Sequence, residues 1–595
     1  MKRNKIKLPD VKLFKGVWLI KKKKKKDNEY YLDIIKGLIE KGFNNGGIID
    51  FNNKENGLFY SKTEDGYIRV YDTKNPILHN EKKINIKIKK YEYNKNISAE
   101  FSFFSSFFDK RWDDIPYPPS LLYLSGKSIK RGIKSSVSII DKESNNYEIP
   151  KTDFWGFTLF DDLLPEILEF FNEIRITYQG KIGAGGPLVT LSPLTVITHI
   201  GDINFIVRGE ADNIIADILN LISGFEKNDI FSIFNEISKF QGFYYNDDDY
   251  FILANMDRVN SVIDIDSLEI DFSVIPDKKL EKGLELNLSR GCPRSCIFCS
   301  HIHGKKFRII NPENLKTILK NYKKEIEKRK IDSSQIFNIN INDDDILLGQ
   351  EKTCEIIDTI KAEGFKIYGF QTSISSFVDK RGIDYKMLDY IGDKELYADN
   401  PLLWIGTDTF LEKRGKRLGK QYLKKEMFEI LLNEFQKRDI INYHYWIILD
   451  GDSDWKEFID EFFYIWEISK RTENFNLLPT SSYLIPYPYS AAYLKDVKRE
   501  NSRVIIKKIL KSRTGGYDYP VIEREQPEDE FLTRAVSPVF EYKTIEYLKN
   551  KDFFNAFQRI YPYIKKSQFY LKMEDKERYL FLNEIDGKVE KLLKA

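Results

Sequence analysis

Residues 283–299 read Gly-Leu-Glu-Leu-Asn-Leu-Ser-Arg-Gly-Cys-Pro-Arg-Ser-Cys-Ile-Phe-Cys, and this stretch decides the fold. Apolar residues at alternate positions of 284–288 predict a strand that runs straight into a loop. The loop contains three of the four cysteines of the chain, Cys292, Cys296 and Cys299, in the spacing C-x3-C-x2-C. Three thiolates on one short loop can hold three corners of a cubane iron–sulfur cluster and leave its fourth iron without a protein ligand. An open metal position of this kind is typical of a catalytic site.

A structural zinc site is the alternative interpretation of the same cysteines. Zinc takes four ligands, and His301 or His303 would complete a Cys3His set. A disulfide framework is not expected, because a 595-residue chain with four cysteines does not depend on cross-links. Gly291 and Pro293 flank the first cysteine and suit a backbone that wraps tightly around a cluster.

The cysteine loop resembles the signature of the radical S-adenosylmethionine (SAM) enzymes, and Phe298 matches the aromatic residue usual before the third cysteine. The resemblance implies a [4Fe–4S] cluster whose open iron binds the amino and carboxylate groups of SAM. It also implies that the cluster passes one electron to the sulfonium, and that the resulting 5′-deoxyadenosyl radical takes a hydrogen atom from the substrate. An external one-electron reductant such as flavodoxin or ferredoxin would supply the electron.

Composition places few limits on function. A chain of 595 residues is long enough for two to four domains. The 94 Lys and Arg residues nearly balance the 91 Asp and Glu residues, so charge indicates neither a nucleic-acid partner nor a membrane surface. No apolar stretch approaches the about 18 residues of a spanning helix, and no apolar region follows the basic N-terminus. We therefore expect a cytoplasmic protein, in a reducing compartment that suits an oxygen-sensitive cluster.

Strands and helices alternate between residues 93 and 225. The pattern predicts an open parallel sheet, which binds ligands beyond the carboxyl ends of its strands. The expected elements are strands at 96–101, 137–141, 154–159, a strand ending at 183–187, and 203–210, with helices beginning near 118 and spanning 163–174.

This region resembles the cobalamin-binding domain that precedes the barrel in one large radical SAM subfamily, of the class B type. The matching pieces are the helix start at 118–124, Gly185-Gly186-Pro187, and the strand that ends in Gly209-Glu210. The resemblance covers about residues 95–490 and implies that these residues bind cobalamin. None of the five histidines lies in the Asp-x-His-x-x-Gly motif that ligates cobalt. Binding without a histidine ligand and a fold that persists without its cofactor both stay open.

After the cysteines, strands at 337–342, 366–373, 403–408, 445–451 and 478–486 alternate with helices. With the strand at 283–288 they predict six βα units and a partial (β/α)6 barrel, whose active site lies at the carboxyl ends of the strands. The resemblance implies roles for strand-end residues. It places Asp343 and Asp344 near the methionine amino group, Gln371 and Ser373 at the ribose or carboxylate, Asp408 where a glutamate is usual, and Gly451 at the adenine.

Plainer interpretations compete with these roles. An Asp-rich turn would explain Asp343 and Asp344, and an ordinary turn would explain Gly451. Lys420 matches a lysine of the family only by position, and a surface lysine is the expected interpretation. Cys354 is expected to be a small buried residue on a helix outside the barrel, with a hydrogen-atom donor as its alternative.

Together these patterns predict an α/β protein with five segments. They are an extension (1–92), a cobalamin-binding-like Rossmann domain (93–225), a linker (226–280), a radical SAM barrel (281–490) and a helical region that covers the substrate (491–595). The expected activity is cobalamin-dependent methylation of carbon in a small molecule or peptide. The alternatives are a radical SAM epimerase, cyclase or rearrangement enzyme without cobalamin, and a non-catalytic zinc or iron–sulfur protein.

Overall fold

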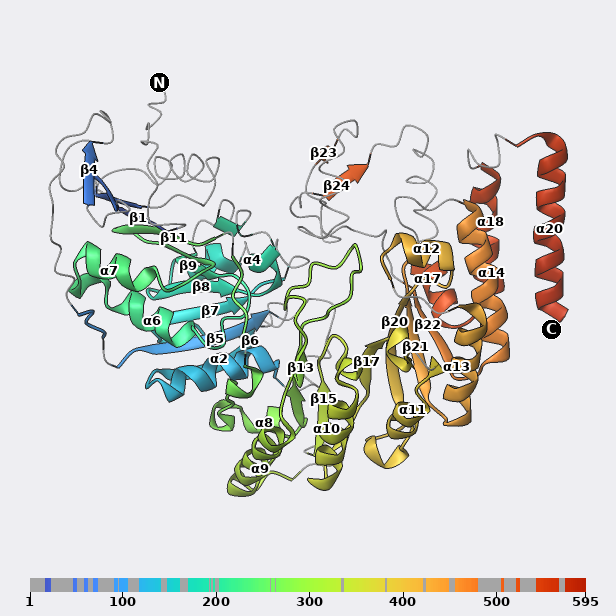
Figure 1. Ribbon diagram of the computed structural model, residues 1–595, viewed down its shortest axis with the longest axis horizontal. Coiled ribbons are helices and arrows are strands. Elements are labelled where there is room, and N and C mark those ends of the chain that lie inside the picture. Colours follow the sequence, from blue (N-terminus) through green and yellow to red (C-terminus); the bar gives the residue numbers. More distant parts are fainter. Residues whose placement is uncertain are drawn as a thin grey trace. The chain divides into compact units, whose positions relative to one another are not determined.

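The protein is described by a computed structural model (Figure 1), in which the chain forms two compact units, Met1–Pro276 and Asp277–Ala595. The described residues are 17–22, 47–50, 58–62, 68–72, 90–104 without 95, 117–140, 147–160, 170–197 without 192, 194 and 195, 203–332 without 257 and 263, 337–379, 382–420, 424–448, 455–479, 504–507, 521–524, 542–566 and 573–594.

The first unit is built on one 11-stranded sheet in the order β4-β3-β2-β1-β11-β10-β9-β8-β7-β5-β6. The five strands β9-β8-β7-β5-β6 are parallel to one another, as the sequence predicts. The strands are β1 (Val17–Lys21), β2 (Gly47–Asp50), β3 (Leu58–Lys62), β4 (Ile68–Asp72), β5 (Ser98–Phe104), β6 (Lys134–Ile140), β7 (Phe154–Thr158), β8 (Lys181–Gly185), β9 (Phe205–Val207), β10 (Phe243–Asn246) and β11 (Tyr250–Ala254).

Helices and aromatic side chains cover this parallel core. The helix α2 (Pro119–Lys130) has a proline in its first turn, which favours a helix start, and it lies along β5 and β6 (Figure 1). The fully buried Trp155 of β7 lies among other aromatic rings and donates to Ser102 Oγ at 2.7 Å. The other described helices of this unit are α4 (Pro187–Leu191), α6 (Ile215–Ser223) and α7 (Ile230–Ile237).

The sheet extends beyond the predicted Rossmann segment. Residues 226–280, expected to be a linker, contain the antiparallel hairpin β10–β11, in which Phe243 pairs with Val207 of β9. The strand β1, from the expected extension 1–92, pairs in turn with β11. Nearly all side chains of these strands are apolar or aromatic and buried, so pairing removes them from water and covers the open edge of β9.

The second unit places parallel strands in chain order in two sheets, β12-β15-β16 and β17-β20-β21-β22. Only Tyr368 and Gly369 separate β16 from β17, so these strands occupy six successive positions, the number expected for six βα units. The strands are β12 (Leu284–Leu286), β15 (Asn338–Ile341), β16 (Lys366–Ile367), β17 (Phe370–Ser373), β20 (Leu402–Asp408), β21 (Ile441–Trp446) and β22 (Phe475–Pro479).

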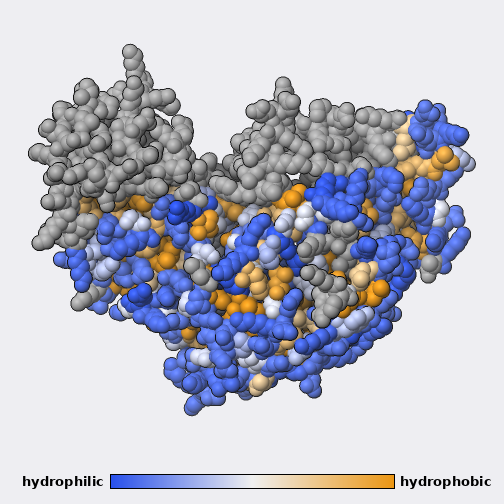
Figure 2. Space-filling view, viewed as in Figure 1, coloured by the Kyte–Doolittle hydropathy of each residue, from blue (hydrophilic) through white to orange (hydrophobic). Residues whose placement is uncertain are grey.

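The two faces of these strands differ in polarity. Side chains such as Leu286, Ile341 and Ile405 are buried on the face that packs against helices. Figure 1 shows these helices along one side of the strands, and in Figure 2 the surface over α9 and α10 is mostly hydrophilic. The helices are α8 (Asp277–Leu280), α9 (Pro312–Arg329), α10 (Glu351–Ala362), α11 (Tyr385–Ile391), α12 (Glu412–Arg417), α13 (Lys425–Lys437) and α14 (Trp455–Arg471).

The C-terminal part is helical where it is described, as predicted, except for the hairpin of β23 (Val504–Lys507) and β24 (Val521–Arg524). Its helices are α17 (Tyr542–Lys549), α18 (Phe553–Lys566) and α20 (Asp575–Lys594). Phe553 and Phe557 of α18 pack on Phe462 of α14, so this aromatic stripe is core. Among the described residues, none of the helices combines the length and the apolar character needed to cross a bilayer.

Candidate functional site

The cysteine loop is closed at its base by two short antiparallel strands, β13 (Ser289–Arg290) and β14 (Arg308–Ile309). Gly291 follows β13 with φ of +84°, and a Cβ there would lie 2.3 Å from the carbonyl oxygen of Lys306. The N–H of Cys292 donates to the carbonyl oxygen of Gly304 at 3.1 Å. Glycine at position 291 therefore lets the two arms of the loop approach each other where the first cysteine begins.

All three loop cysteines are free thiols, Cys296 buried and the other two half-buried. Burial raises the pKa of each thiol, and for Cys299 the neighbouring Cys296 and Cys292 raise the pKa further. The N–H of His301 donates to Cys299 Sγ at 3.4 Å. The thiols therefore lie near one another, and a metal that binds them would displace their protons.

The fit of this loop to a metal group depends on how the ligands converge. In the described part of the chain, no three His, Cys, Asp or Glu side chains are grouped as the ligands of one metal ion would be. In a cubane cluster each cysteine binds a different iron, so the sulfurs need not meet at one point. A tight backbone cradle with three neighbouring thiols fits such a cluster.

The aspartates after β15 lie in different environments. Asp343 is buried, and its carboxylate accepts from the Leu288 N–H at 2.8 Å and from Ser289 Oγ at 2.9 Å. Burial raises the pKa of Asp343 to about 7. These bonds join the end of β15 to the segment that leads into the cysteine loop.

Asp344 is exposed. Its negative charge is among the influences that, after burial, raise the pKa of Cys292 and of Cys299. Of the predicted pair, Asp344 is therefore the exposed carboxylate whose charge acts on the loop cysteines, whereas both oxygens of Asp343 are engaged within the protein.

The third aspartate, Asp345, was missed by the sequence analysis and is the centre of a buried polar network. Its carboxylate forms an ion pair with Arg294 of the cysteine loop at 2.8 Å. It also accepts from Thr372 Oγ1 at 2.6 Å, Ser376 Oγ at 2.7 Å and the Ser373 N–H at 3.3 Å. Asp345 thus ties the loop to the carboxyl end of the next strand. No local signal distinguishes it from its two neighbours.

The predicted residues of β17 have unequal exposure. Gln371 is exposed and pairs in register with Trp404 of β20. Ser373 is buried at the strand end, where it contacts Asp345 through its N–H and lies 3.2 Å from Ser375, measured between the Oγ atoms. Gly451 lies outside the described residues.

Asp408 and Lys420 form a buried ion pair beside the cysteine loop. Asp408 has φ of +62°, a left-handed conformation that is unfavourable for a side-chain residue. Burial alone would lower the pKa of Lys420, but the charges of Asp408 and Cys296 outweigh it and raise the pKa. Lys420 Nζ also lies 5.9 Å from the ring centroid of Phe298. The expectation of a surface lysine is wrong, because the turn at 418–420 packs against the loop through a 2.9 Å bond from the Ile297 N–H to the Leu418 carbonyl.

Gly185, Gly186 and Pro187 follow β8 in the first unit. Gly186 has φ of +89°, and a Cβ there would lie 3.0 Å from the backbone nitrogen of Leu159, at the end of β7. The N–H of Leu159 donates to the Gly185 carbonyl at 3.0 Å. The glycines therefore bring the ends of two neighbouring strands together.

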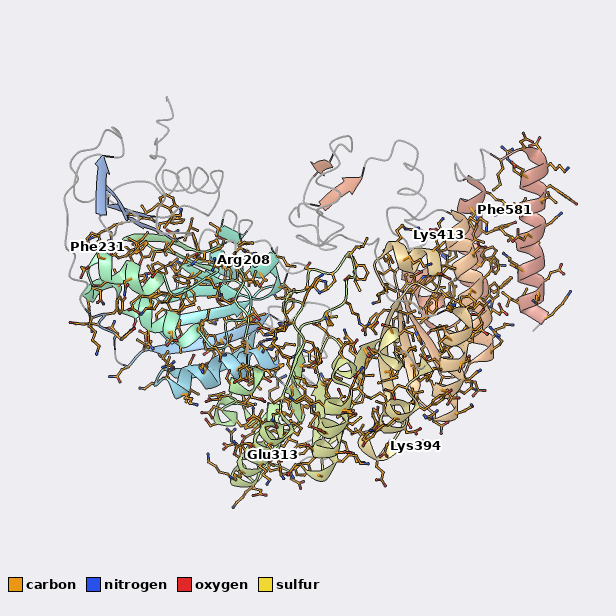
Figure 3. The ribbon with its side chains drawn as sticks, viewed as in Figure 1. Arg208, Phe231, Glu313, Lys394, Lys413 and Phe581 are labelled. Carbon is orange, nitrogen blue, oxygen red and sulfur yellow. The ribbon has the colours of Figure 1, made fainter. Side chains whose placement is uncertain are left out.

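Thr190 joins these glycines to the segment after β9, although the sequence analysis did not single it out. Its Oγ1 donates to the Gly186 carbonyl at 2.8 Å and accepts the Gly209 N–H at 2.9 Å. The Thr190 carbonyl accepts from the guanidinium of Arg208, labelled in Figure 3. Glu210 is buried and accepts the Val262 N–H. The two predicted motifs thus form one structure at the carboxyl ends of adjacent strands.

Comparison with known proteins supports the fold. No family model matches the sequence, and no curated protein matches it. OxsB, a cobalamin-dependent SAM radical enzyme solved with aqua-cobalamin, is 14% identical, with a TM-score of 0.57 over 89% of this chain and 83% of that one. TsrM from Kitasatospora setae, a radical SAM methyltransferase solved with cobalamin and a [4Fe–4S] cluster, is 12% identical, with a TM-score of 0.50 over 68% of this chain and 75% of that one. The chain therefore has the fold of the cobalamin-dependent radical SAM enzymes, as the cysteine loop and the strand-end motifs predict.

Proposed function

We propose that this protein is a radical SAM enzyme that binds a [4Fe–4S] cluster through Cys292, Cys296 and Cys299, and that it methylates carbon with the help of cobalamin. The observation that carries the proposal is the cysteine loop itself, a glycine-closed cradle of three neighbouring thiols at the carboxyl ends of parallel strands. The likeness of the fold, over 68–89% of the chain, to cobalamin-dependent radical SAM enzymes supports it.

The cofactors supply the difficult chemistry when bound: electron transfer to SAM from the cluster, and methyl transfer through cobalamin. The protein itself binds the cofactors and the substrate, orients them and shields them from water. Asp344 is the proposed partner of the SAM ammonium group, because a carboxylate facing the cysteine loop pairs well with a cation. Gln371 and Ser373 are proposed to contact the ribose or the carboxylate of SAM.

The pair of Lys420 and Asp408 is proposed to bind SAM beside Cys296. A buried ammonium held by one carboxylate has donors left for an anionic group. Asp343 and Asp345 support the site from behind, since both use their oxygens to hold the loop and the strand ends in place.

The first unit is proposed to hold cobalamin near the carboxyl ends of its parallel strands. Adjacent parallel strands whose connections lead in opposite directions create a crevice at these ends, and β5 with β7 forms this arrangement. Gly185 leaves space for a ligand close to the backbone, because a Cβ there would find its nearest atom 3.7 Å away. None of the five histidines lies in the motif that ligates cobalt, so cobalamin would bind here without a histidine ligand from that motif.

The test is the metal content of protein that is purified without oxygen, supplied with iron, sulfide and hydroxocobalamin, and desalted. About four irons and one cobalt per chain, with reductant-dependent formation of 5′-deoxyadenosine, are expected. Cys296→Ala should lose the cluster and SAM cleavage together. Cys354→Ala should keep both, because Cys354 is buried on α10 and the charges that act on it come from Lys386, Asp358 and Asp384 and not from the loop. Iron without cobalt would leave the alternative, a radical SAM epimerase, cyclase or rearrangement enzyme. Zinc, or iron without SAM cleavage, would contradict both.

A further inference from the structure

Glu285 is a buried carboxyl group on the polar face of the first parallel strand of the second unit. Its neighbours Leu284 and Leu286 point to the opposite face, where helices cover the strands. Glu285 is 3% exposed and pairs in register with Asn340 of β15. The side chain therefore belongs to the face that the helices leave uncovered.

Two amides hold this carboxyl group. Asn340 Nδ2 donates to Oε2 at 3.2 Å, and Asn342 Nδ2 donates to Oε1 at 2.9 Å. No Lys, Arg or His among the described residues forms an ion pair with Glu285, and burial raises its pKa to about 7. A buried carboxyl group without a cation is costly.

Among the described residues, the surroundings supply further acceptors, and no positive charge is among the influences on the pKa of Glu285. Because Asn340 and Asn342 donate through their nitrogens, their Oδ1 atoms remain acceptors beside the carboxyl group. Asn342 and Asp344, just beyond the end of β15, are exposed, so the cluster borders solvent at Asn342 although Glu285 itself is buried. Lys366 shares this face by register, but it is exposed at the amino end of β16, opposite Asn338.

The same face of the neighbouring sheet is amide-rich and aromatic. One row of residues in register runs across four strands, consisting of Gln371, Trp404, Tyr443 and Asn476. This row has rings and amides but no positive charge to pair with an anion such as a phosphate, so it suits a substrate that is neutral or cationic.

We propose that Glu285, Asn340 and Asn342 form a binding site for a primary ammonium group of the substrate. An ammonium group donates three hydrogen bonds, and the carboxylate and the two amide oxygens provide three acceptors on one face of adjacent strands. The inference rests on the proposed function, in which this face is the substrate side of the barrel, and it narrows the substrate to an amine. Glu285 supplies the negative charge, and the two asparagines hold its carboxylate in place.

The test measures binding of three amine probes, n-butylamine, tyramine and tryptamine, to the full-length reconstituted protein by calorimetry. N-acetyltryptamine serves as the matched neutral probe. At least one amine should bind saturably below about 10 mM. Glu285→Gln should weaken that binding at least tenfold, and the neutral probe should not bind. Glu313→Gln, at an exposed position on α9 labelled in Figure 3, should bind the amine as the wild type does.

A second variant, Asn342→Leu, keeps the test valid if Glu285→Gln fails to fold. Asn342 is exposed, so its replacement should weaken amine binding without unfolding the chain. Absence of saturable amine binding, or equal binding by the wild type and Glu285→Gln, would overturn the inference. Formation of 5′-deoxyadenosine by the wild type is measured on the same preparation. Its failure would refute the proposed function, whereas a failure of amine binding in protein that cleaves SAM would refute only this inference.

Discussion

Arg294, in the middle of the cysteine loop, forms a 2.8 Å ion pair with Asp345, which follows the second parallel strand, and both side chains are buried. The guanidinium also donates to Ser376 Oγ at 2.5 Å. The loop that carries the three cysteines is thus held to the segment after β15 by a charged pair. Its position depends on contacts with two other strand ends as well as on its own backbone.

Asp345→Asn should lower the free energy of unfolding by about 3 kcal/mol, because it removes the carboxylate that pairs with the buried guanidinium of Arg294. The cluster loop should then be less ordered, so bound iron after reconstitution should fall as well. Chemical denaturation and iron analysis measure the two effects. Unchanged stability and iron content would show that the pair is dispensable.

Asp344→Asn should keep the fold and the cluster, because this side chain is exposed. If its carboxylate pairs with the SAM ammonium, the KM for SAM in 5′-deoxyadenosine formation should rise about tenfold, the worth of one charge-assisted contact. An unaltered KM would exclude Asp344 from SAM binding. The variant also controls for the Asp345 substitution, since the two change the same chemical group at adjacent positions.

Gly291→Ala should abolish the cluster, because a methyl group would lie 2.3 Å from the Lys306 carbonyl oxygen and the loop could not close. Gly304→Ala is the matched control. Its φ of +75° is similar, but a methyl group on Gly304 would have no atom within 4 Å, so only the backbone cost of about 1 kcal/mol applies. The two variants are compared by their iron content and by the visible absorbance of the cluster. Equal iron content would show that the contact at Lys306 relaxes easily.

Gly186→Ala should reduce bound cobalt and leave bound iron unchanged. The added methyl group would press on Thr158 and Leu159 at the end of β7, where the proposed cobalamin crevice begins. Gly132→Ala, with φ of +81° and open space around it, should retain cobalt. Cobalt and iron are determined on the same desalted samples. A loss of both metals from Gly186→Ala would point to general unfolding.

Stability should depend on pH through Glu285. Burial raises the pKa of this carboxyl group from 4.5 to about 7 in the folded state. The unfolded chain therefore releases the proton first as pH rises. Below about pH 4.5 the carboxyl group is protonated in both states, so its ionisation does not lower the free energy of unfolding. Between about pH 4.5 and about pH 7 the free energy of unfolding falls, by up to about 3 kcal/mol in total.

Glu285→Gln removes this titration. The free energy of unfolding of the variant minus that of the wild type should therefore be larger at pH 8 than at pH 5. Denaturant unfolding of both proteins at both pH values measures this difference. A difference that does not change with pH would mean that Glu285 titrates normally in the folded protein.

The parts of the fold that could be predicted are local in the sequence. The cysteine spacing, the Gly-Gly-Pro turn after β8 and the alternation of strands with helices are all contained in short runs of residues, and the structure confirms the parallel sheet, the six strand positions and the helical C-terminal part. The hairpin β10–β11 lies in a predicted linker, because only its pairing with β9 shows that it belongs to the sheet.

What only the tertiary structure decided is which residues meet across separate strand ends. Arg294 reaches Asp345 over 51 positions, and Glu285 reaches Asn340 over 55. Asp408 forms an ion pair with Lys420, which the sequence predicts to be a surface lysine. Spacing and periodicity are set by the covalent chain and are visible in it, whereas these pairs depend on strand register and on which face each side chain occupies, which are settled only when the sheet packs.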